Sequence, residues 1–218
     1  LAKHASPNGS VLRHPCLLAG DALSLDYSPD GGGEPVTVRG TGRGATCAEL
    51  VRYMFDAQPD PTECAGPRCG LPLPHEDHYY AAGYYYYLAV HLGLARENAR
   101  ALAQSHVPAE QRAINAEFER FNVTVAQYER AGLRLCAETT HSAQKEMLDR
   151  SVKWEEGRYS CFSGLYVAAM LRRSYGFADH APPLSVIATH YGTTIDWTLG
   201  ATIDAPPSPA TRTHRAGT

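Results

Sequence analysis

Apolar and polar positions along the chain follow a period of two in one short segment and a helical period in several longer ones. Residues 35–39 alternate as a half-buried strand does, and a turn over residues 40–45 follows. The first expected helix opens near Thr46, which can cap it together with Glu49. Its apolar face comprises Leu50, Val51, Met54 and Phe55. Further helices are expected over residues 79–102, 109–137, 142–154 and 161–174, and a buried strand over residues 184–189.

The segments between these elements are rich in Gly and Pro and are expected to be loops. Residues 1–35 contain one short apolar stretch, and residues 57–78 form an irregular segment rich in Pro, Gly and Cys. Residues 205–218 are expected to be a disordered Pro/Ser/Thr tail, which leaves residues 1–204 as the folded portion. The order of elements predicts an α/β protein with a helix-rich middle, without the regular alternation of a complete doubly wound sheet.

The composition is that of an ordinary globular protein, with 218 residues of which 44% are hydrophobic and 20% charged. The net charge of −3 argues against a nucleic acid as partner, because proteins that bind phosphate backbones are normally basic. No apolar run approaches the roughly 18 residues of a membrane span. The chain begins at Leu1 without a signal segment, as a processed or truncated protein would.

The cysteines indicate an oxidising compartment, since their even number permits complete pairing, although many pairings are open. They are Cys16, Cys47, Cys64, Cys69, Cys136 and Cys161. Two sequons, at Asn8 and Asn122, are candidate glycosylation sites. These features predict a secreted, extracellular or secretory-lumenal protein, with any membrane anchor upstream of Leu1.

Three local motifs suggest chemistry, but each has a simpler interpretation. Residues 40–45 match the G-x-G-x-x-A of a dinucleotide site, yet no acidic residue ends a second strand about 20 positions later, which favours a plain strand–turn–helix connection. A thiol nucleophile at Cys161 would lack a local activating group. A zinc site is less favoured than a small disulfide loop, and its ligands would be Cys64, Cys69, His75 and His78.

Tyrosines are concentrated over residues 79–87, where six of the chain's 13 tyrosines lie. On a helix, Tyr80, Tyr84 and Tyr87 would share one face, whereas their neighbours would point elsewhere. About half of these rings are therefore expected in the core and half at the surface. An exposed ring of this kind can stack on a nucleobase or a sugar.

Together with the cysteines, the aromatic and C-terminal segments resemble the nucleoside triphosphate diphosphohydrolase (apyrase) family of ecto-nucleotidases. The resemblance covers most of residues 13–203 and follows the family's order. The matching stretches are Arg13–Leu17 (RHPCL), Gly40–Phe55, Cys64–Cys69, Tyr80–Leu94, Tyr159–Tyr166 (YSCFSGLY) and Asp196–Ala201 (DWTLGA). The family's first four signatures would all precede Arg13, so only the C-terminal half of such an enzyme is expected here.

The resemblance implies a partial actin-like, ribonuclease-H-type fold, mainly its C-terminal lobe. It also implies the disulfide pairs 16–47, 64–69 and 136–161. The parent reaction would be the hydrolysis of terminal phosphates of nucleoside tri- and diphosphates, ATP and ADP among them, with Ca²⁺ or Mg²⁺. The catalytic base and the phosphate-binding loops would belong to the missing N-terminal half, the expected partner. No catalytic residue or metal ligand is therefore expected in this chain, which would be inactive alone.

The resemblance also implies a nucleobase held between two aromatic walls. Tyr87 matches the first stacking tyrosine, and Gly83 and Tyr84 match residues beside the base. At the second wall Ser160 stands in the stacking position, with Tyr159 one residue earlier.

Trp197 matches a tryptophan near the metal and phosphates, with Asp196 in place of the usual glycine. Taken alone, these two residues would suit a buried ring behind a helix cap. An arginine that contacts the base in some members is replaced by Ala19. Two other functions are weighed against this one: a non-catalytic secreted protein that binds nucleosides or a partner, and a disulfide-stabilised module of other descent.

Overall fold

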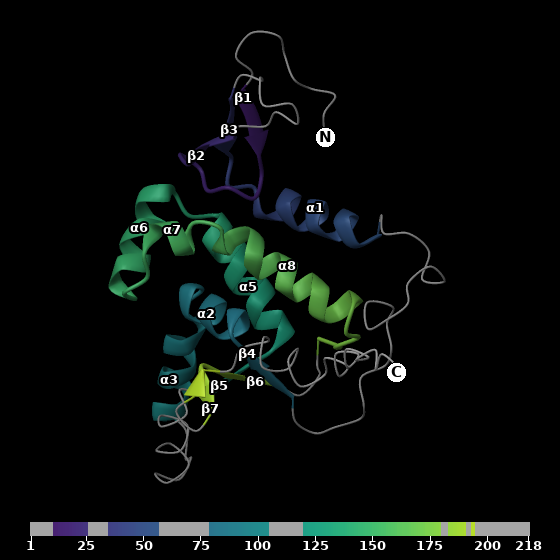
Figure 1. Cartoon of the computed structure of the whole chain (residues 1–218), viewed down its shortest axis with the longest axis vertical. Coiled ribbons are helices and arrows are strands. Elements are labelled where there is room, and N and C mark those ends of the chain that lie inside the picture. The colour runs from purple at the N-terminus through teal and green to yellow at the C-terminus, as the bar shows by residue number, and fades with distance from the viewer. Residues whose placement is uncertain are drawn as a thin grey trace, which may run out of the picture.

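The computed structural model describes residues 11–25, 35–56, 79–104, 120–179, 183–190 and 193–194. Within them, two small three-stranded sheets lie at opposite ends of a layer of packed helices (Figure 1). We call these the first-sheet end, which carries β1 to β3, and the second-sheet end, which carries β4 to β6.

The first sheet consists of β1 (Val11–His14), β2 (Ala22–Leu25) and β3 (Val36–Gly40), in the order β1–β3–β2. β3 runs parallel to β1 and antiparallel to β2, and it buries Val38. The strand predicted at residues 35–39 is confirmed. The expectation of a loop was wrong for β1 and β2, because such short strands acquire their structure from pairing with β3 rather than from a pattern of their own.

Helices α1 (Gly44–Asp56), α5 (Val125–Cys136) and α8 (Ser160–Arg173) form the layer between the sheets. α5 and α8 pack closely because each carries a glycine where they meet. A Cβ added at Gly164 would lie 3.0 Å from the Cα of Gly132. The helix predicted over residues 161–174 is therefore confirmed as α8, and its fold depends on these small residues.

The start of α1 differs from the prediction. The helix begins at Gly44, so Thr46 lies inside its first turn and is not its cap. Cys47 and Val51 point into the core, whereas Met54, which was expected on the apolar face, is exposed.

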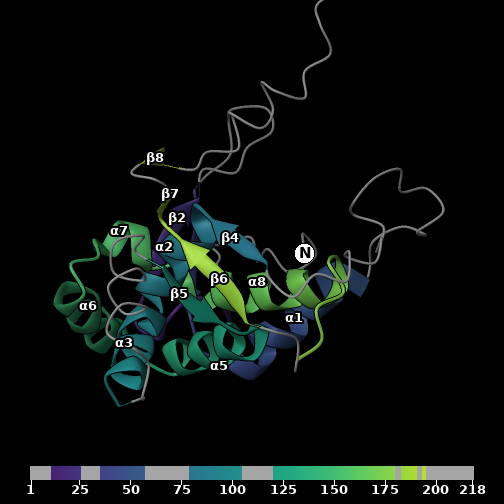
Figure 2. The ribbon, with the colours of Figure 1, turned by 90° about the horizontal axis from the view of Figure 1, so that it is seen from below.

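The second sheet consists of β4 (Tyr80–Ala82), β5 (Arg120–Val123) and β6 (Leu184–Ile187), with β6 in the middle (Figure 2). β6 pairs parallel with β4 and antiparallel with β5. Val186 is completely buried, as expected for the central strand of a small sheet. The strand predicted over residues 184–189 is confirmed in β6, and β7 (Thr189–His190) pairs with β8 (Thr193–Thr194) beyond it.

The single helix predicted over residues 79–102 is wrong. Two glycines with positive φ, Gly83 at 61° and Gly93 at 80°, interrupt it because a helix does not accommodate that backbone conformation. The segment instead forms β4, α2 (Tyr84–His91) and α3 (Leu94–Gln104).

The helix predicted over residues 109–137 is also only partly correct. Its described portion begins with β5 and continues as α5, which starts at a capping box formed by Thr124 and Gln127. The next predicted helix, over residues 142–154, is two helices, α6 (Thr140–Asp149) and α7 (Trp154–Gly157).

These elements give a mixed α/β fold, as predicted. The actin-like arrangement stays a prediction. The predicted tail, residues 205–218, lies outside the described residues, so the expected division of the chain at residue 204 also stays a prediction.

Candidate functional site

Two tyrosines on α2 and one at the start of α8 present their rings to solvent, and we call them the exposed tyrosines. Tyr84 and Tyr87 lie on one face of α2 and are 58% and 50% exposed, and Tyr159 at the start of α8 is 43% exposed. Leu88 and Ala89 in the same helix are buried against the core, whereas the rings of Tyr84 and Tyr87 remain in contact with solvent. Exposed rings in this number are suited to stacking against a flat ligand.

The neighbouring tyrosines on α2 serve the interior instead. Tyr85 and Tyr86 are half-buried and pack against the core, and Tyr86 lies 5.5 Å from Phe121 between ring centroids. The buried hydroxyl of Tyr128 donates a hydrogen bond of 2.8 Å to the backbone carbonyl of Tyr85. The expectation that half of the rings are core and half surface is confirmed for Tyr84 to Tyr87.

Burial sets the protonation state of these inner rings. It raises the pKa of Tyr85 to about 12, with a further contribution from the neighbouring Tyr175. The pKa of Tyr128 is raised further, again because burial disfavours the phenolate. Both hydroxyls are therefore neutral donors over the whole physiological range.

Ser160 and His91 join α8 to α2. Ser160 is only 2% exposed, and its Oγ lies 3.5 Å from Nδ1 of His91. Burial lowers the pKa of His91, and the charge of Glu156 opposes this shift. His91 follows Tyr87 by one helical turn, so this contact brings the start of α8, with Tyr159, close to the part of α2 that carries Tyr87.

A buried ion pair lies beside Tyr159. Arg158 Nη2 donates to Asp21 Oδ1 at 2.6 Å, and Asp21 is 6% exposed. The guanidinium carbon lies 5.8 Å from the ring centroid of Trp154 and 5.5 Å from that of Tyr159. Sequence reasoning missed this group. The spacing of Trp154 and Arg158, four residues apart, was the available signal for their contact.

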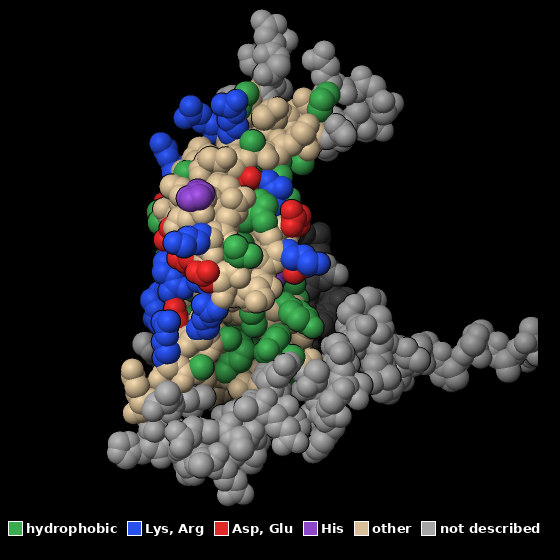
Figure 3. Space-filling view, turned by 90° about the vertical axis from the view of Figure 1, so that its left-hand side faces the viewer, with side chains coloured by type: hydrophobic (Ala, Val, Ile, Leu, Met, Phe, Trp, Pro, Cys, Tyr) green, Lys and Arg blue, Asp and Glu red, His purple; other side chains and the backbone are tan. Residues whose placement is uncertain are grey.

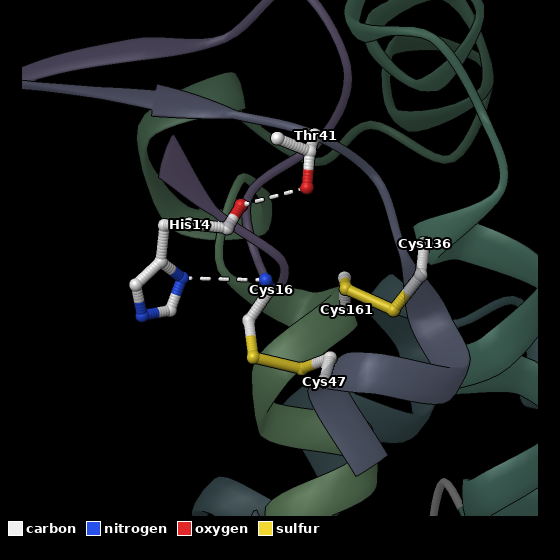
Figure 4. The surroundings of a disulfide bond; sticks show 6 residues. All are labelled: His14, Cys16, Thr41, Cys47, Cys136 and Cys161. Atoms are coloured by element: carbon white, nitrogen blue, oxygen red, sulfur yellow. Dashed lines mark hydrogen bonds between the residues drawn. A yellow bond between two sulfur atoms is a disulfide. The ribbon is translucent and has the colours of Figure 1, made fainter. Parts of the chain in front are cut away.

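Two disulfides lie side by side at the helix layer (Figure 4). Cys16 joins Cys47, linking the segment after β1 to α1, and Cys136 joins Cys161, linking α5 to α8. These are two of the three implied pairs, and the third, 64–69, lies outside the described residues. Because the sulfur of Cys161 is bonded, it is not a free nucleophile.

The segment before Cys16 is held by polar contacts of His14. Its Nδ1 accepts a hydrogen bond of 3.2 Å from the backbone N–H of Cys16 (Figure 4). The hydroxyl of Thr41 donates to the backbone carbonyl of His14 at 3.5 Å. Burial lowers the pKa of His14, which keeps Nδ1 available as an acceptor.

The glycines of the G-x-G-x-x-A motif have a packing role. A Cβ at Gly40 would come within 2.0 Å of the backbone oxygen of Leu18, so only glycine permits this crossing of the chain. Gly42 has a φ of 61° and faces the backbone oxygen of Cys136. These contacts agree with the strand–turn–helix interpretation.

A charged pocket of about 330 Å³ lies between α3, α5 and α6. Its charges largely neutralise one another, since Arg134 bonds Glu97 at 2.6 Å and Arg150 bonds Glu146. Figure 3 shows the side of the molecule that carries α3 and α6, with basic and acidic side chains interspersed and hydrophobic ones gathered toward the second-sheet end.

One cluster of potential metal-binding side chains lies among the described residues, and it does not suit Ca²⁺ or Mg²⁺. Among them, one group brings three potential metal-binding atoms within 4.8 Å of one another, the sulfurs of Cys47, Cys136 and Cys161. These sulfurs are already in disulfides, and both ions prefer oxygen ligands. Trp197 and Asp196, which the resemblance places near the metal, lie outside the described residues.

The two sequons differ in what the structure describes. Asn122 lies in β5 and is exposed, whereas Asn8 lies outside the described residues. No helix in the described ranges combines the length and the apolar character that crossing a bilayer requires.

Comparison with known proteins shows similarity to a protein family and to a curated human protein. The model of the GDA1/CD39 (nucleoside phosphatase) family matches residues 2–211. Human ectonucleoside triphosphate diphosphohydrolase 8 is 27% identical over 206 residues, which cover 88% of this chain and 36% of that protein. The chain thus spans about a third of the length of this curated relative.

Proposed function

Because the chain belongs to the GDA1/CD39 (nucleoside phosphatase) family, we propose that it is the C-terminal portion of an enzyme that removes terminal phosphates from nucleoside tri- and diphosphates. The match covers 36% of the human relative, which supports the proposal that this chain corresponds to one part of such an enzyme. The N-terminal half then supplies the catalytic base and the phosphate-binding loops, and this chain supplies the nucleobase-binding residues.

The exposed tyrosines on α2 and at the start of α8 carry the proposal. Tyr87 forms one wall for the nucleobase, and Tyr84 lies beside the base on the same face of α2. Gly83, directly before α2, has no side chain that would crowd the ligand. Stacking of a base on an aromatic ring contributes about 1–3 kcal/mol, enough for a wall of this kind to determine affinity.

Tyr159 is the better candidate for the second wall than Ser160. The hydroxyl of Ser160 is buried against His91, whereas the ring of Tyr159 is exposed. The displacement of the tyrosine by one position therefore still leaves an aromatic ring at the start of α8. His91, neutral because its pKa is lowered, places no charge beside the base.

Ca²⁺ or Mg²⁺ is proposed as the cofactor of the complete enzyme, where a divalent cation neutralises charge on the phosphate oxygens. Since the described residues offer no oxygen-rich site, the N-terminal half is proposed to hold the ion. Trp197 and Asp196 are proposed to lie near the ion and the phosphates.

A secretory or extracellular location is proposed from the disulfides, which persist in oxidising compartments. Asn8 and Asn122 are the proposed glycosylation sites. Asn122 is exposed, as a glycan acceptor must be.

The test combines hydrolysis with nucleoside binding. The 218-residue chain alone should release no phosphate from ATP or ADP with Ca²⁺ or Mg²⁺, and activity should appear when an N-terminal fragment of the enzyme is supplied. Robust turnover by the chain alone would contradict the proposed division of labour.

Binding of adenosine to the chain tests the nucleobase site separately. Tyr87→Ala should weaken binding about tenfold, the effect of losing one stacking contact. Tyr53→Ala is the matched control, because Tyr53 is an exposed tyrosine on α1. Equal loss in both variants would mean that the effect is not specific to α2.

A further inference from the structure

We propose that Arg158 is a positioning residue for the nucleobase site: Asp21 anchors its guanidinium, which covers one face of Tyr159 and leaves the other face to the base. The inference rests on the proposed function, since it assigns Tyr159 as a wall of that site. It adds that Asp21, which lies at the first-sheet end and far from Tyr159 in sequence, anchors the residue that orients this wall.

The anchor is strong and directional. Arg158 Nη2 donates both to Asp21 Oδ1 at 2.6 Å and to the backbone carbonyl of Ala22 at 3.2 Å. Asp21 Oδ1 also accepts the backbone N–H of Ala22 at 2.9 Å, which fixes the carboxylate. Because Asp21 is buried and charge-assisted hydrogen bonds are short and strong, the guanidinium has one defined position.

From that position the guanidinium makes a cation–π contact with each of two aromatic rings. Trp154 and Tyr159 have their ring centroids 5.8 Å and 5.5 Å from the guanidinium carbon, within the range of cation–π contact. The cation occupies one side of the Tyr159 ring, while the side chain remains 43% exposed. An incoming base therefore meets a ring whose orientation is already set.

The backbone at Tyr159 does not provide this orientation. Tyr159 precedes the first turn of α8 at the cap position, and its side chain makes no capping hydrogen bond. Stacking on the guanidinium supplies the restraint, and the flat guanidinium suits this purpose better than an ammonium group. Ordering the ring before the ligand arrives reduces the entropic cost of binding.

The test uses the 218-residue chain with ¹³C-labelled tyrosine rings, titrated with adenosine. Arg158→Lys keeps a cation that can pair with Asp21 but removes the flat stacking surface. We expect the ring signals of Tyr159, assigned through Tyr159→Phe, to shift, and adenosine binding to weaken about three- to tenfold.

Arg172→Lys is the matched control, because Arg172, like Arg158, is paired with carboxylates. Its partners are Glu129 and Asp179. It should move neither the Tyr159 signals nor the affinity. Should Arg158→Lys fail to fold, Trp154→Leu is the second variant. It removes the Trp154 ring that contacts the guanidinium and leaves the ion pair of Arg158 with Asp21 intact. It should cause a smaller change in the same direction.

The outcomes separate this inference from the proposed function. If Arg158→Lys folds, shifts no Tyr159 signal and binds adenosine as the wild type does, the positioning role is wrong. Loss of stability without loss of affinity would likewise overturn it and leave a structural ion pair. If Tyr159→Ala binds adenosine normally while Arg158→Lys still shifts the ring signals of Tyr159, the assignment of the wall fails, and the positioning role falls with its premise.

Discussion

At the first-sheet end, segments that are far apart in sequence are joined by specific bonds, whereas the second-sheet end is held mainly by apolar packing. The first sheet is tied to the helices by the Cys16–Cys47 disulfide and by the Asp21–Arg158 pair, which spans 137 residues of sequence. At the second sheet, the central strand β6 and helix α2 bury aliphatic side chains, and the tyrosines above them stay exposed.

The first-sheet end holds residues in defined positions, whereas the second-sheet end leaves side chains exposed to a ligand. Bonds with defined geometry place Arg158 and the start of α8, while apolar packing supports α2 without using up the outward faces of Tyr84 and Tyr87. Substitutions at the first-sheet end should therefore cost stability, and substitutions of the exposed tyrosines should cost binding.

The largest expected effect is the loss of the first-sheet disulfide. The double variant Cys16→Ala, Cys47→Ala should lose about 3 kcal/mol of unfolding free energy, because the bond closes a loop with a sequence separation of 31. Urea unfolding followed by circular dichroism measures it. As a control, Tyr84→Ser with Tyr87→Ser should change stability by about 0.5 kcal/mol or less. Similar losses in both variants would remove the contrast between the two ends.

A smaller effect is expected beneath the exposed tyrosines. Tyr128→Phe removes the hydroxyl that donates to the Tyr85 carbonyl and should cost about 1 kcal/mol, because a buried hydrogen bond is lost. Tyr84→Phe removes an exposed hydroxyl and should cost almost nothing. Urea unfolding of both variants, measured side by side, gives the difference in their unfolding free energies. No loss in Tyr128→Phe would show that packing alone supports α2.

The smallest expected effect is a dependence of stability on pH. Burial lowers the pKa values of His14 and His91 below 6.5, so the unfolded chain binds more protons than the folded one as the pH falls through that region. Stability from each histidine is present above pH 6.5 and is lost as the pH falls toward the lowered pKa, because protonation in the folded state must overcome burial.

Asparagine at either position can retain a hydrogen-bond acceptor without titrating. His14→Asn and His91→Asn should each flatten part of the stability profile between pH 7 and pH 5, measured by urea unfolding at several pH values. An unchanged slope in one variant would assign the dependence to the other histidine.

Local pattern predicted some elements of the fold. β3, α8 and β6 were predicted because their apolar period or length is sufficient without neighbours. β1 and β2 were missed because neither buries a side chain fully, so no apolar pattern marks them and both depend on pairing with β3. The helix expected over residues 79–102 failed at Gly83 and Gly93, where backbone conformation overrides the helical spacing of the tyrosines.

The candidate site was also predicted only where local sequence spacing was informative. Contacts between distant segments were missed. Helical spacing predicts that Tyr84 and Tyr87 share one face of α2, but their exposure depends on how α2 packs in the folded chain. The pairing of Asp21 with Arg158 has no local signal, since only the folded chain brings the two together. The contact of His91 with Ser160 likewise depends on how α2 meets α8.

The close approach of Gly132 and Gly164 limits how this sequence can diverge. The space between α5 and α8 at that point admits no added atom without displacing backbone. Both positions therefore compete for the same interhelical space. A larger side chain at either can be accepted only if the helices separate, and the Cys136–Cys161 bond beside them opposes that separation. Substitution at these two glycines is therefore constrained jointly rather than one position at a time.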